Sequence, residues 1–200
     1  MHYIETHTIK DDYMKFHYVP NLLTALRISL IPIFIAMFYY PSEWKYITTT
    51  VIFGFAAITD WLDGYLARKL EQTSHIGAFL DPVADKLIVV VALILLTESF
   101  HSLLISIPTA IIICREITIS ALREWMANCG KSEEVAVSFL GKVKTAMQMI
   151  SILLLLFQVP GLEKPIMILG YICLYISTFF AIWSMYKYLS VAFKHVQLTK

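Results

Sequence analysis

The stretch DWLDGYLARKLEQTSHIGAFLDPVAD, residues 60–85, gathers four aspartates in a chain that is otherwise rich in apolar residues. Apart from Asp11 and Asp12, it contains every aspartate of the 200-residue sequence, of which 58% is hydrophobic and 16% charged. A mean hydropathy of +0.68 lies far above the range of soluble domains. Because charged side chains are costly in a bilayer, this composition predicts a membrane-embedded protein whose acidic stretch has a function.

Six segments are long and apolar enough, some with their polar ends included, to cross a bilayer as helices of about 20 residues. The last of them is the most apolar, since residues 165–186 include no charged side chain. We therefore predict an all-α fold, a bundle of six transmembrane helices preceded by a short interfacial segment. The predicted spans are residues 22–40, 46–66, 78–97, 100–122, 143–160 and 165–187.

The basic residues predict how these helices are oriented, because cytoplasmic loops carry an excess of Lys and Arg. If the N-terminus lies inside, only Lys45 and Lys164 of the sixteen Lys and Arg fall on the outer side. The aspartates, at the end of the second span and the start of the third, then face the cytoplasm. We expect a six-span domain, residues 20–190, between an N-terminal cytoplasmic or interfacial segment, residues 1–19, and a cytoplasmic tail, residues 191–200.

The spacing of the aspartates predicts a metal site. Asp60 and Asp63 are three residues apart and Asp81 and Asp85 four apart, so each pair lies on one face of its helix. The two helices are joined by a short connection and should pack antiparallel, which lets the two faces meet. Four converging carboxylates repel one another unless a cation lies between them, and we expect no protein cation among them. Carboxylate oxygens suit Mg²⁺ or Mn²⁺, and two such ions bound to phosphates are typical of phosphoryl chemistry.

A basic cluster, Arg115, Arg123, Lys142 and Lys144, flanks the predicted inner turn between the fourth and fifth spans. Each residue singly is also typical of a positive-inside loop, but Arg115 follows TAIIIC within an apolar span, where a charge is usually functional. Together they could bind a phosphate, the arginines as bidentate forks and the lysines as point charges. The cluster therefore favours an acceptor substrate that carries a phosphate group.

Glu116 and Glu124 each adjoin one of these arginines in the sequence. Consecutive residues of a helix point about 100° apart, so we expect neither glutamate to face its neighbouring arginine directly.

Written with its spacing, Asp60-x2-Asp63-Gly64-x2-Ala67-Arg68-x8-Gly77-x3-Asp81-x3-Asp85 resembles the signature of the CDP-alcohol phosphatidyltransferase family at every position. The flanking stretches VPNLLTALRISLIP, GAFLDPVADKL, CREITISALREWMA and SFLGKVKTAMQM resemble the members that use glycerol 3-phosphate as acceptor. The resemblance implies six transmembrane helices, a homodimer and an active site that opens to the cytoplasm and the lipid interface. It also implies residence in the bacterial inner membrane, with no nucleic-acid partner.

The resemblance further assigns roles to residues. The four aspartates would hold two divalent cations, Mg²⁺ or Mn²⁺, and Asp85 would also be the general base. The pocket for CDP-diacylglycerol would be lined by Asn21, Thr24, Asp63, Gly64, Ala67, Arg68 and Gly77. The implied reaction is attack by the 1-hydroxyl of sn-glycerol 3-phosphate, held by the basic cluster, on CDP-diacylglycerol, with CMP as leaving group.

Three other functions are compatible with parts of the pattern. Intramembrane prenyltransferases also bind Mg²⁺ through aspartates, but their motifs lie in two separate helix pairs of a longer bundle. A cation transporter would place its acids near the middle of the membrane, often in repeated halves, and this sequence has no internal repeat. Within the family, a CMP-forming cardiolipin synthase uses the same signature with phosphatidylglycerol as acceptor, and a basic acceptor pocket would serve that substrate as well.

Overall fold

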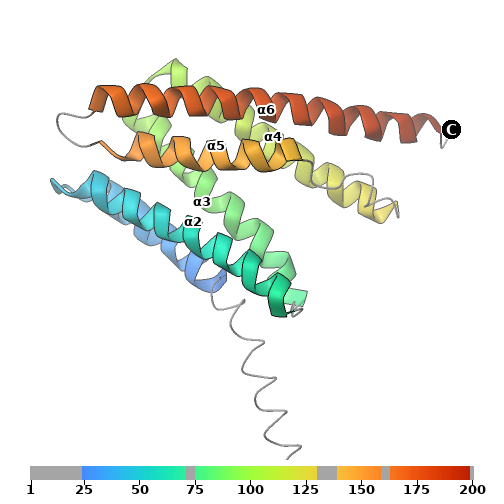
Figure 1. Cartoon of the computed structure of the whole chain (residues 1–200), viewed down its shortest axis with the longest axis horizontal. Helices are drawn as coiled ribbons and strands as arrows, with labels where there is room; N and C mark the ends of the chain where they lie inside the picture. The colour runs from blue at the N-terminus through green and yellow to red at the C-terminus, as the bar shows by residue number, and fades with distance from the viewer. Residues whose placement is uncertain (1–23, 71–74, 130–138, 159–162, 199–200) are drawn as a thin grey trace, which may run out of the picture. The chain divides into compact units, whose positions relative to one another are not determined.

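A computed structural model of the chain describes residues 24–70, 75–129, 139–158 and 163–198 (Figure 1). Its regular structure is helical throughout these ranges, which confirms the all-α prediction. Each of the six predicted spans corresponds to one helix, while the N-terminal segment, residues 1–19, lies outside the described residues. The helices are an unlabelled first helix, described over Thr24–Tyr39, then α2 (Lys45–Leu70), α3 (His75–Phe100), α4 (Leu103–Asn128), α5 (Phe139–Leu156) and α6 (Glu163–Leu198).

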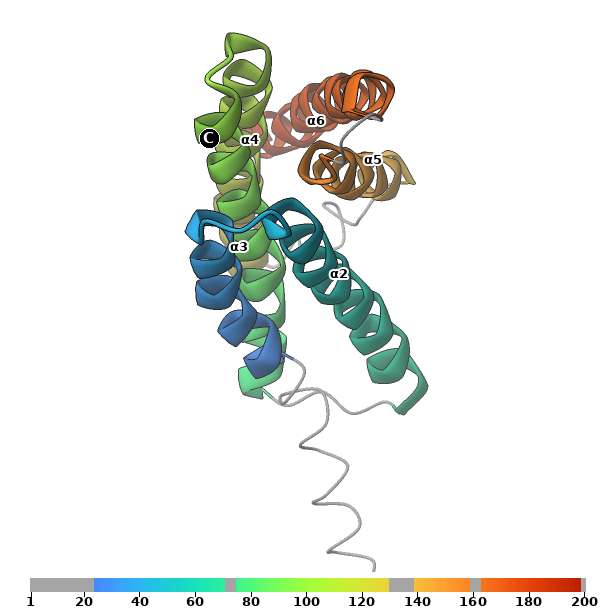
Figure 2. The same ribbon diagram turned by 90° about the vertical axis from the view of Figure 1, so that its left-hand side faces the viewer.

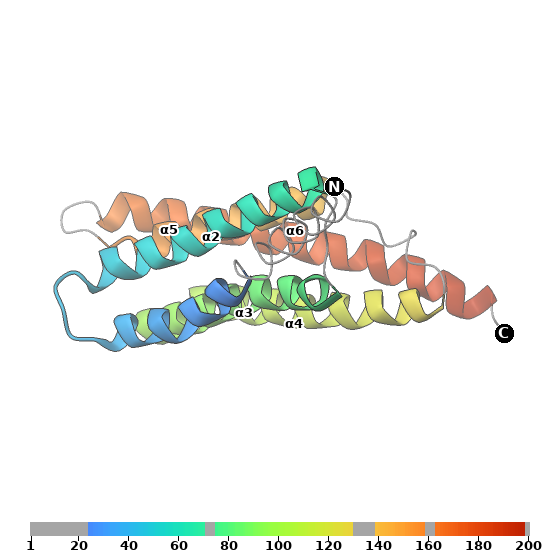
Figure 3. The same cartoon turned by 90° about the horizontal axis from the view of Figure 1, so that it is seen from below.

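The chain divides into two compact units, one ending at Val91 and the other beginning at Ala92, so that α3 contributes to both. The first unit contains the first helix, α2 and the first part of α3. Figure 3 shows that the connection after Tyr39 reverses the chain, so that α2 runs back along the first helix. Phe34 and Phe53, both fully buried, join these two helices through ring centroids 6.3 Å apart. In Figure 2 the first helix also lies alongside the first part of α3.

In the second unit, α5 and α6 run side by side in opposite directions (Figure 1), and α4 packs against α6. Gly170 lets α5 and α6 approach closely, because a Cβ atom there would lie 2.9 Å from the Leu155 side chain. Ser151 Oγ donates a hydrogen bond of 2.9 Å to the Gly170 carbonyl oxygen across this contact. Small residues commonly allow such close packing between membrane helices.

Only two residues, His101 and Ser102, connect α3 with α4. His101 adopts a left-handed φ of 44°, which allows the chain to turn sharply. Ser102 caps α4, its side chain accepting a hydrogen bond of 3.3 Å from the Leu104 backbone N–H. The helices consequently lie together, and Thr97 Oγ1 donates to Thr109 Oγ1 at 3.3 Å.

The second unit buries more charged and polar side chains than a soluble domain normally does. The second unit buries two charged groups, Arg115 and Lys144, together with several hydroxyl and amide side chains. Many large apolar side chains lie at its surface, and those on α6 alone are Ile168, Leu169, Ile172, Tyr175, Ile176, Phe179, Ile182, Trp183 and Tyr186. Soluble monomers rarely expose a continuous apolar patch of this extent. The pattern is that expected of helices surrounded by lipid.

Two helices in the described part of the chain are long and apolar enough to cross a membrane. They are α4 and the part of α6 from Lys164 to Ser190, and the first helix is apolar but shorter. These helices indicate a membrane protein, while the arrangement of all six helices as transmembrane spans stays a prediction.

Candidate active site

An acidic cluster in the first unit brings its three helices together. It consists of Arg27 from the first helix, Asp60 from α2 and Asp85 from α3. Arg27 NH1 donates a hydrogen bond to Asp85 Oδ1 and lies 3.6 Å from Asp60 Oδ1. The Arg27 side chain is 1% exposed, whereas those of Asp60 and Asp85 are 41% and 36% exposed. The guanidinium thus lies in the interior, and the carboxylates that it joins are accessible from outside.

The expectation that no protein cation lies among the aspartates is wrong, because Arg27 contacts both Asp85 and Asp60. A buried guanidinium remains charged and needs carboxylate partners, so these three side chains stabilise one another. The sequence did contain a signal for Arg27. It is a charged residue within a predicted span, the feature that made Arg115 a candidate, and it lies one turn after Thr24 on the same helix face.

The described carboxylates of this cluster fit a divalent cation. Asp60 and Asp85 come from different helices and converge on one point, as their sequence spacing predicts. Their oxygens are the hard donors that Mg²⁺ and Mn²⁺ prefer, and both side chains are accessible. Asp63 and Asp81 lie on α2 and α3, but their side chains are outside the described part of the structure. Within the described residues no group of three acidic, His or Cys ligands occurs.

The residues expected to line the nucleotide pocket are described only in part. Thr24 is buried, with 1% exposure, and lies one helical turn before Arg27. Asn21 lies outside the described residues. The structure places the remaining five on helices without describing their side chains: Asp63, Gly64, Ala67 and Arg68 on α2, and Gly77 on α3.

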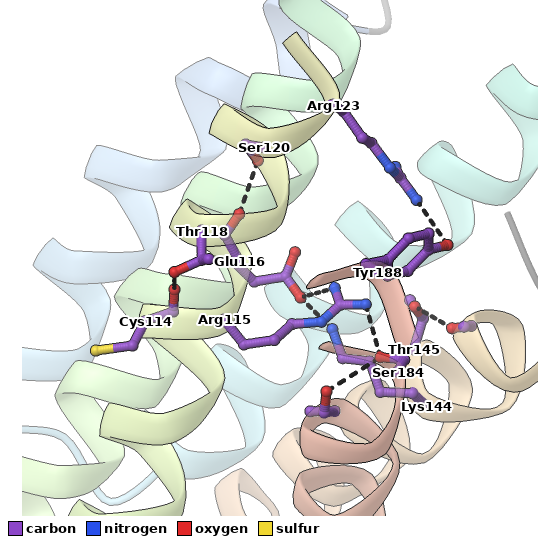
Figure 4. A network of polar contacts seen from close by, with 12 residues as sticks. Cys114, Arg115, Glu116, Thr118, Ser120, Arg123, Lys144, Thr145, Ser184 and Tyr188 are labelled. Carbon is purple, nitrogen blue, oxygen red and sulfur yellow. Dashed lines mark hydrogen bonds and ion pairs between the residues drawn. The ribbon is translucent and has the colours of Figure 1, made fainter. Parts of the chain in front are cut away.

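A second charged cluster joins the helices of the second unit and is drawn in Figure 4. Glu116 of α4 accepts hydrogen bonds from Lys144 Nζ of α5 and from Arg115 NH1, the latter at 3.0 Å. Arg115 NH2 also donates to Ser184 Oγ of α6 at 2.9 Å. The Arg115, Lys144 and Glu116 side chains are 8%, 4% and 16% exposed. Glu116 therefore binds two nearly buried cations, and the cluster links α4 to α5 through Lys144 and to α6 through the hydrogen bond of Arg115 to Ser184.

The expectation that Glu116 does not face Arg115 is wrong. Both side chains are long, and both turn toward the space where Lys144 approaches from α5 (Figure 4). The sequence argument considered positions on α4 alone, whereas the partner that draws Glu116 inward lies 28 residues away on another helix. Ser184, which the sequence analysis did not select, completes this cluster.

The other two members of the predicted basic cluster, Arg123 and Lys142, are exposed. Arg123 NH2 donates to the hydroxyl of buried Tyr188 at 3.4 Å, and its guanidinium carbon lies 5.6 Å from the centre of the Tyr188 ring. Lys142 lies in the first turn of α5, two residues before Lys144. The four predicted phosphate-binding residues thus separate into a buried pair that shares Glu116 and an exposed pair that is open to a ligand.

The exposed apolar side chains along the helices and the charged clusters between them identify the chain as a helical membrane protein. Its acidic cluster is suited to a divalent cation. The family model of the CDP-alcohol phosphatidyltransferases matches residues 17–183, a range that includes every charged residue of both clusters. The chain belongs to the CDP-alcohol phosphatidyltransferase family, which confirms the resemblance of residues 60–85 to its signature.

Individual bacterial relatives are similar over nearly their whole lengths. The CDP-diacylglycerol–glycerol-3-phosphate 3-phosphatidyltransferase of Pectobacterium atrosepticum is 50% identical over 179 residues, which cover 90% of this chain and 96% of that protein. The protein of the same name from Pseudomonas fluorescens is 49% identical over 180 residues, or 90% and 92% of the two chains. That of Sodalis glossinidius is 48% identical over 174 residues, or 87% and 94%.

Proposed function

We propose that this chain transfers the phosphatidyl group of CDP-diacylglycerol to the 1-hydroxyl of sn-glycerol 3-phosphate. The products are phosphatidylglycerophosphate, a precursor for phospholipid synthesis, and CMP. The observation that carries the proposal is the identity of about one half to relatives that are named for this reaction, over almost their entire lengths. The two charged clusters support it, because the reaction joins a pyrophosphate donor to a phosphate-bearing acceptor.

In this proposal Asp60, Asp63, Asp81 and Asp85 hold two divalent cations, Mg²⁺ or Mn²⁺. When bound, such ions supply neutralisation of the donor's pyrophosphate and polarisation of its phosphorus. The convergence and accessibility of Asp60 and Asp85 support this assignment. Asp85 also takes the proton of the attacking hydroxyl, and it lies where the first helix and α3 meet. Asn21, Thr24, Gly64, Ala67, Arg68 and Gly77, with Asp63, line the pocket for the CDP group.

The acceptor phosphate binds to the basic cluster. Arg123 and Lys142 are exposed and can meet an incoming anion without breaking an ion pair with an acidic side chain described here. Arg115 and Lys144 are held by Glu116, so their donors are fixed in direction before the acceptor arrives. Because the Arg115 guanidinium and the Lys144 ammonium group are already fixed, they bind phosphate with little further loss of side-chain entropy.

The membrane arrangement is part of the same proposal. Six spans, with the N-terminus inside, place Asp60 and Asp85 at the cytoplasmic face of the bacterial inner membrane, where CMP can leave into water while the lipid product remains in the bilayer. The asymmetry of Lys and Arg supports this orientation. The protein acts as a homodimer, as its family resemblance implies, and residues 1–19 form a cytoplasmic or interfacial segment.

The acceptor is tested with the purified full-length protein in detergent micelles, supplied with CDP-diacylglycerol, Mg²⁺ and one acceptor at a time. We expect release of CMP with sn-glycerol 3-phosphate and none with serine or a neutral amino alcohol. CMP release with phosphatidylglycerol instead would assign the chain to the cardiolipin synthases of the family. Each reaction is repeated in EDTA and again after Mg²⁺ or Mn²⁺ is restored, and full turnover in the chelator would contradict the two-ion site.

A further inference from the structure

Arg27 is the one side chain of the acidic cluster that the proposed reaction does not use. It is 1% exposed, and NH1 contacts Asp85 and lies 3.6 Å from Asp60. The first helix therefore supplies a positive charge to carboxylates that belong to α2 and α3. A basic residue that served only to orient the helix in the membrane would lie at the surface, whereas Arg27 is buried.

The position of Arg27 explains how Asp60 and Asp85 can lie close together when no metal is bound to them. Two carboxylates held close together repel each other, and a cation that contacts both reverses the sign of the interaction. Arg27 supplies that cation from within the chain. Its burial also requires the carboxylates, because an unpaired buried charge is strongly destabilising.

The same position makes Arg27 a competitor of the ions. A divalent cation held by Asp85 would bind directly to a carboxylate oxygen. The guanidinium donates its hydrogen bond to that same carboxylate. The cation and the Arg27 guanidinium would repel each other there, because both are positive and both bind the same carboxylate.

We infer that Arg27 is an internal counter-cation, which holds Asp60 and Asp85 in place in the metal-free protein and yields Asp85 when divalent ions bind. Arg27 is thus a positioning residue that sets the metal affinity of the site. The inference rests on the metal site of the proposed function. It predicts two opposite effects: removal of Arg27 lowers the stability of the metal-free protein and raises its affinity for the metal.

The experiment uses the full-length protein in detergent micelles and compares wild type, Arg27→Gln and Arg27→Lys, with the exposed Lys164→Gln as the control for loss of a positive charge. In EDTA, we expect Arg27→Gln to lower the midpoint of thermal unfolding by about 5–10 °C, because two carboxylates lose their cation. Arg27→Lys keeps the charge and should lose less than half as much, and Lys164→Gln should match wild type.

Binding of Mn²⁺ is then measured by electron paramagnetic resonance of the free ion, with no substrate present. Arg27→Gln should bind Mn²⁺ at least about tenfold more tightly than wild type, since a competing charge has been removed. If Arg27→Gln does not fold in EDTA, its recovery of a cooperative transition in Mn²⁺ supports the inference, and the affinity is compared in Arg27→Lys, where a smaller gain is expected. An affinity in Arg27→Gln that is unchanged or weaker overturns the inference.

A thermodynamic cycle with Asp85→Asn separates the counter-cation role from simple packing. Asp85→Asn removes one of the negative charges that Arg27 neutralises. In that background, Arg27→Gln should lower the midpoint of thermal unfolding in EDTA by less than half as much as it does in the wild-type background. An equal effect in both backgrounds would overturn the inference. Two other results would instead contradict the proposed metal site itself. One is that the wild-type protein binds no Mn²⁺, and the other is that Asp85→Asn binds Mn²⁺ as tightly as wild type does.

Discussion

Replacing Glu116 by Gln should destabilise the second unit, because Glu116 is the carboxylate partner of two nearly buried cations. Lys144 Nζ and Arg115 NH1 both donate to its Oε1. Glutamine keeps the shape and one acceptor oxygen but removes the negative charge, which leaves the two positive charges without a counter-charge from Glu116. Removing one partner of a buried ion pair typically lowers the free energy of unfolding by about 3–5 kcal/mol. Because the glutamine oxygen can still accept a hydrogen bond, we expect a loss of about 2–3 kcal/mol.

The loss is measurable as a change in thermal unfolding. For a chain of about this size, each kcal/mol lowers the midpoint by about 2–4 °C, so Glu116→Gln should unfold about 5–10 °C below wild type. The measurement is circular dichroism at the helical band during heating, on detergent-solubilised protein. Glu124→Gln is the matched control, since Glu124 lies on the same helix next to Arg123 but is exposed, and it should change stability by less than about 0.5 kcal/mol.

A second measurement connects the same variant to the acceptor site. Without the Glu116 carboxylate, Arg115 and Lys144 have charge available for another anion, so inorganic phosphate or glycerol 3-phosphate should raise the unfolding midpoint of Glu116→Gln more than that of wild type. If Glu116→Gln and Glu124→Gln unfold at the same temperature, the ion pairs contribute nothing and the reasoning fails. If Glu116→Gln is less stable but insensitive to phosphate, the cluster is structural and the acceptor binds elsewhere.

The remaining predictions concern packing, orientation and chemistry. Gly170→Ala should lower stability by about 1–3 kcal/mol in thermal unfolding, because the new Cβ would lie 2.9 Å from Leu155 at the α5–α6 contact; a wild-type midpoint would contradict that close approach. In a cysteine-free chain, Gly161→Cys should react with an impermeant reagent from outside intact cells and Gln72→Cys only after permeabilisation, and outside labelling at 72 would invert the orientation. Asp85→Asn should still bind CDP-diacylglycerol yet lose more than about a thousandfold in turnover, and retained turnover would exclude it as the base. Lys142→Ala should weaken the apparent affinity for glycerol 3-phosphate by about thirty- to a hundredfold while that for CDP-diacylglycerol stays near wild type, and the reverse pattern would misplace the acceptor pocket.

Sequence reasoning predicted those parts of the molecule that depend on local periodicity. Long apolar segments can satisfy their backbone in a membrane only as helices or closed barrels, and each predicted span is a helix. The convergence of Asp60 with Asp85 followed from intervals of three and four residues and one short connection. Both inferences need only the geometry of single helices and their order along the chain.

The errors arose where the outcome depends on which helices pack together and how far long side chains reach. Arg27 and Asp85 are 58 residues apart, and no pattern within either helix indicates their contact. Glu116 turns toward Arg115 because Lys144 approaches from α5, which a projection of α4 alone cannot include. The sequence also did not single out Gly170, since a glycine in an apolar helix is commonplace until the neighbouring Leu155 is known.

The two charged clusters are built on the same principle. In the first unit a buried arginine is balanced by aspartates, and in the second a glutamate balances a buried arginine and lysine. Each cluster therefore keeps its charged groups paired before any ligand arrives, which lowers the penalty of placing them among apolar helices. Under the proposed function, each also contains groups that would meet a phosphate substrate or its metal ions, already fixed in direction by an internal partner. In the first unit a bound cation would replace Arg27 on Asp85, as inferred above, so binding would exchange one balanced arrangement for another.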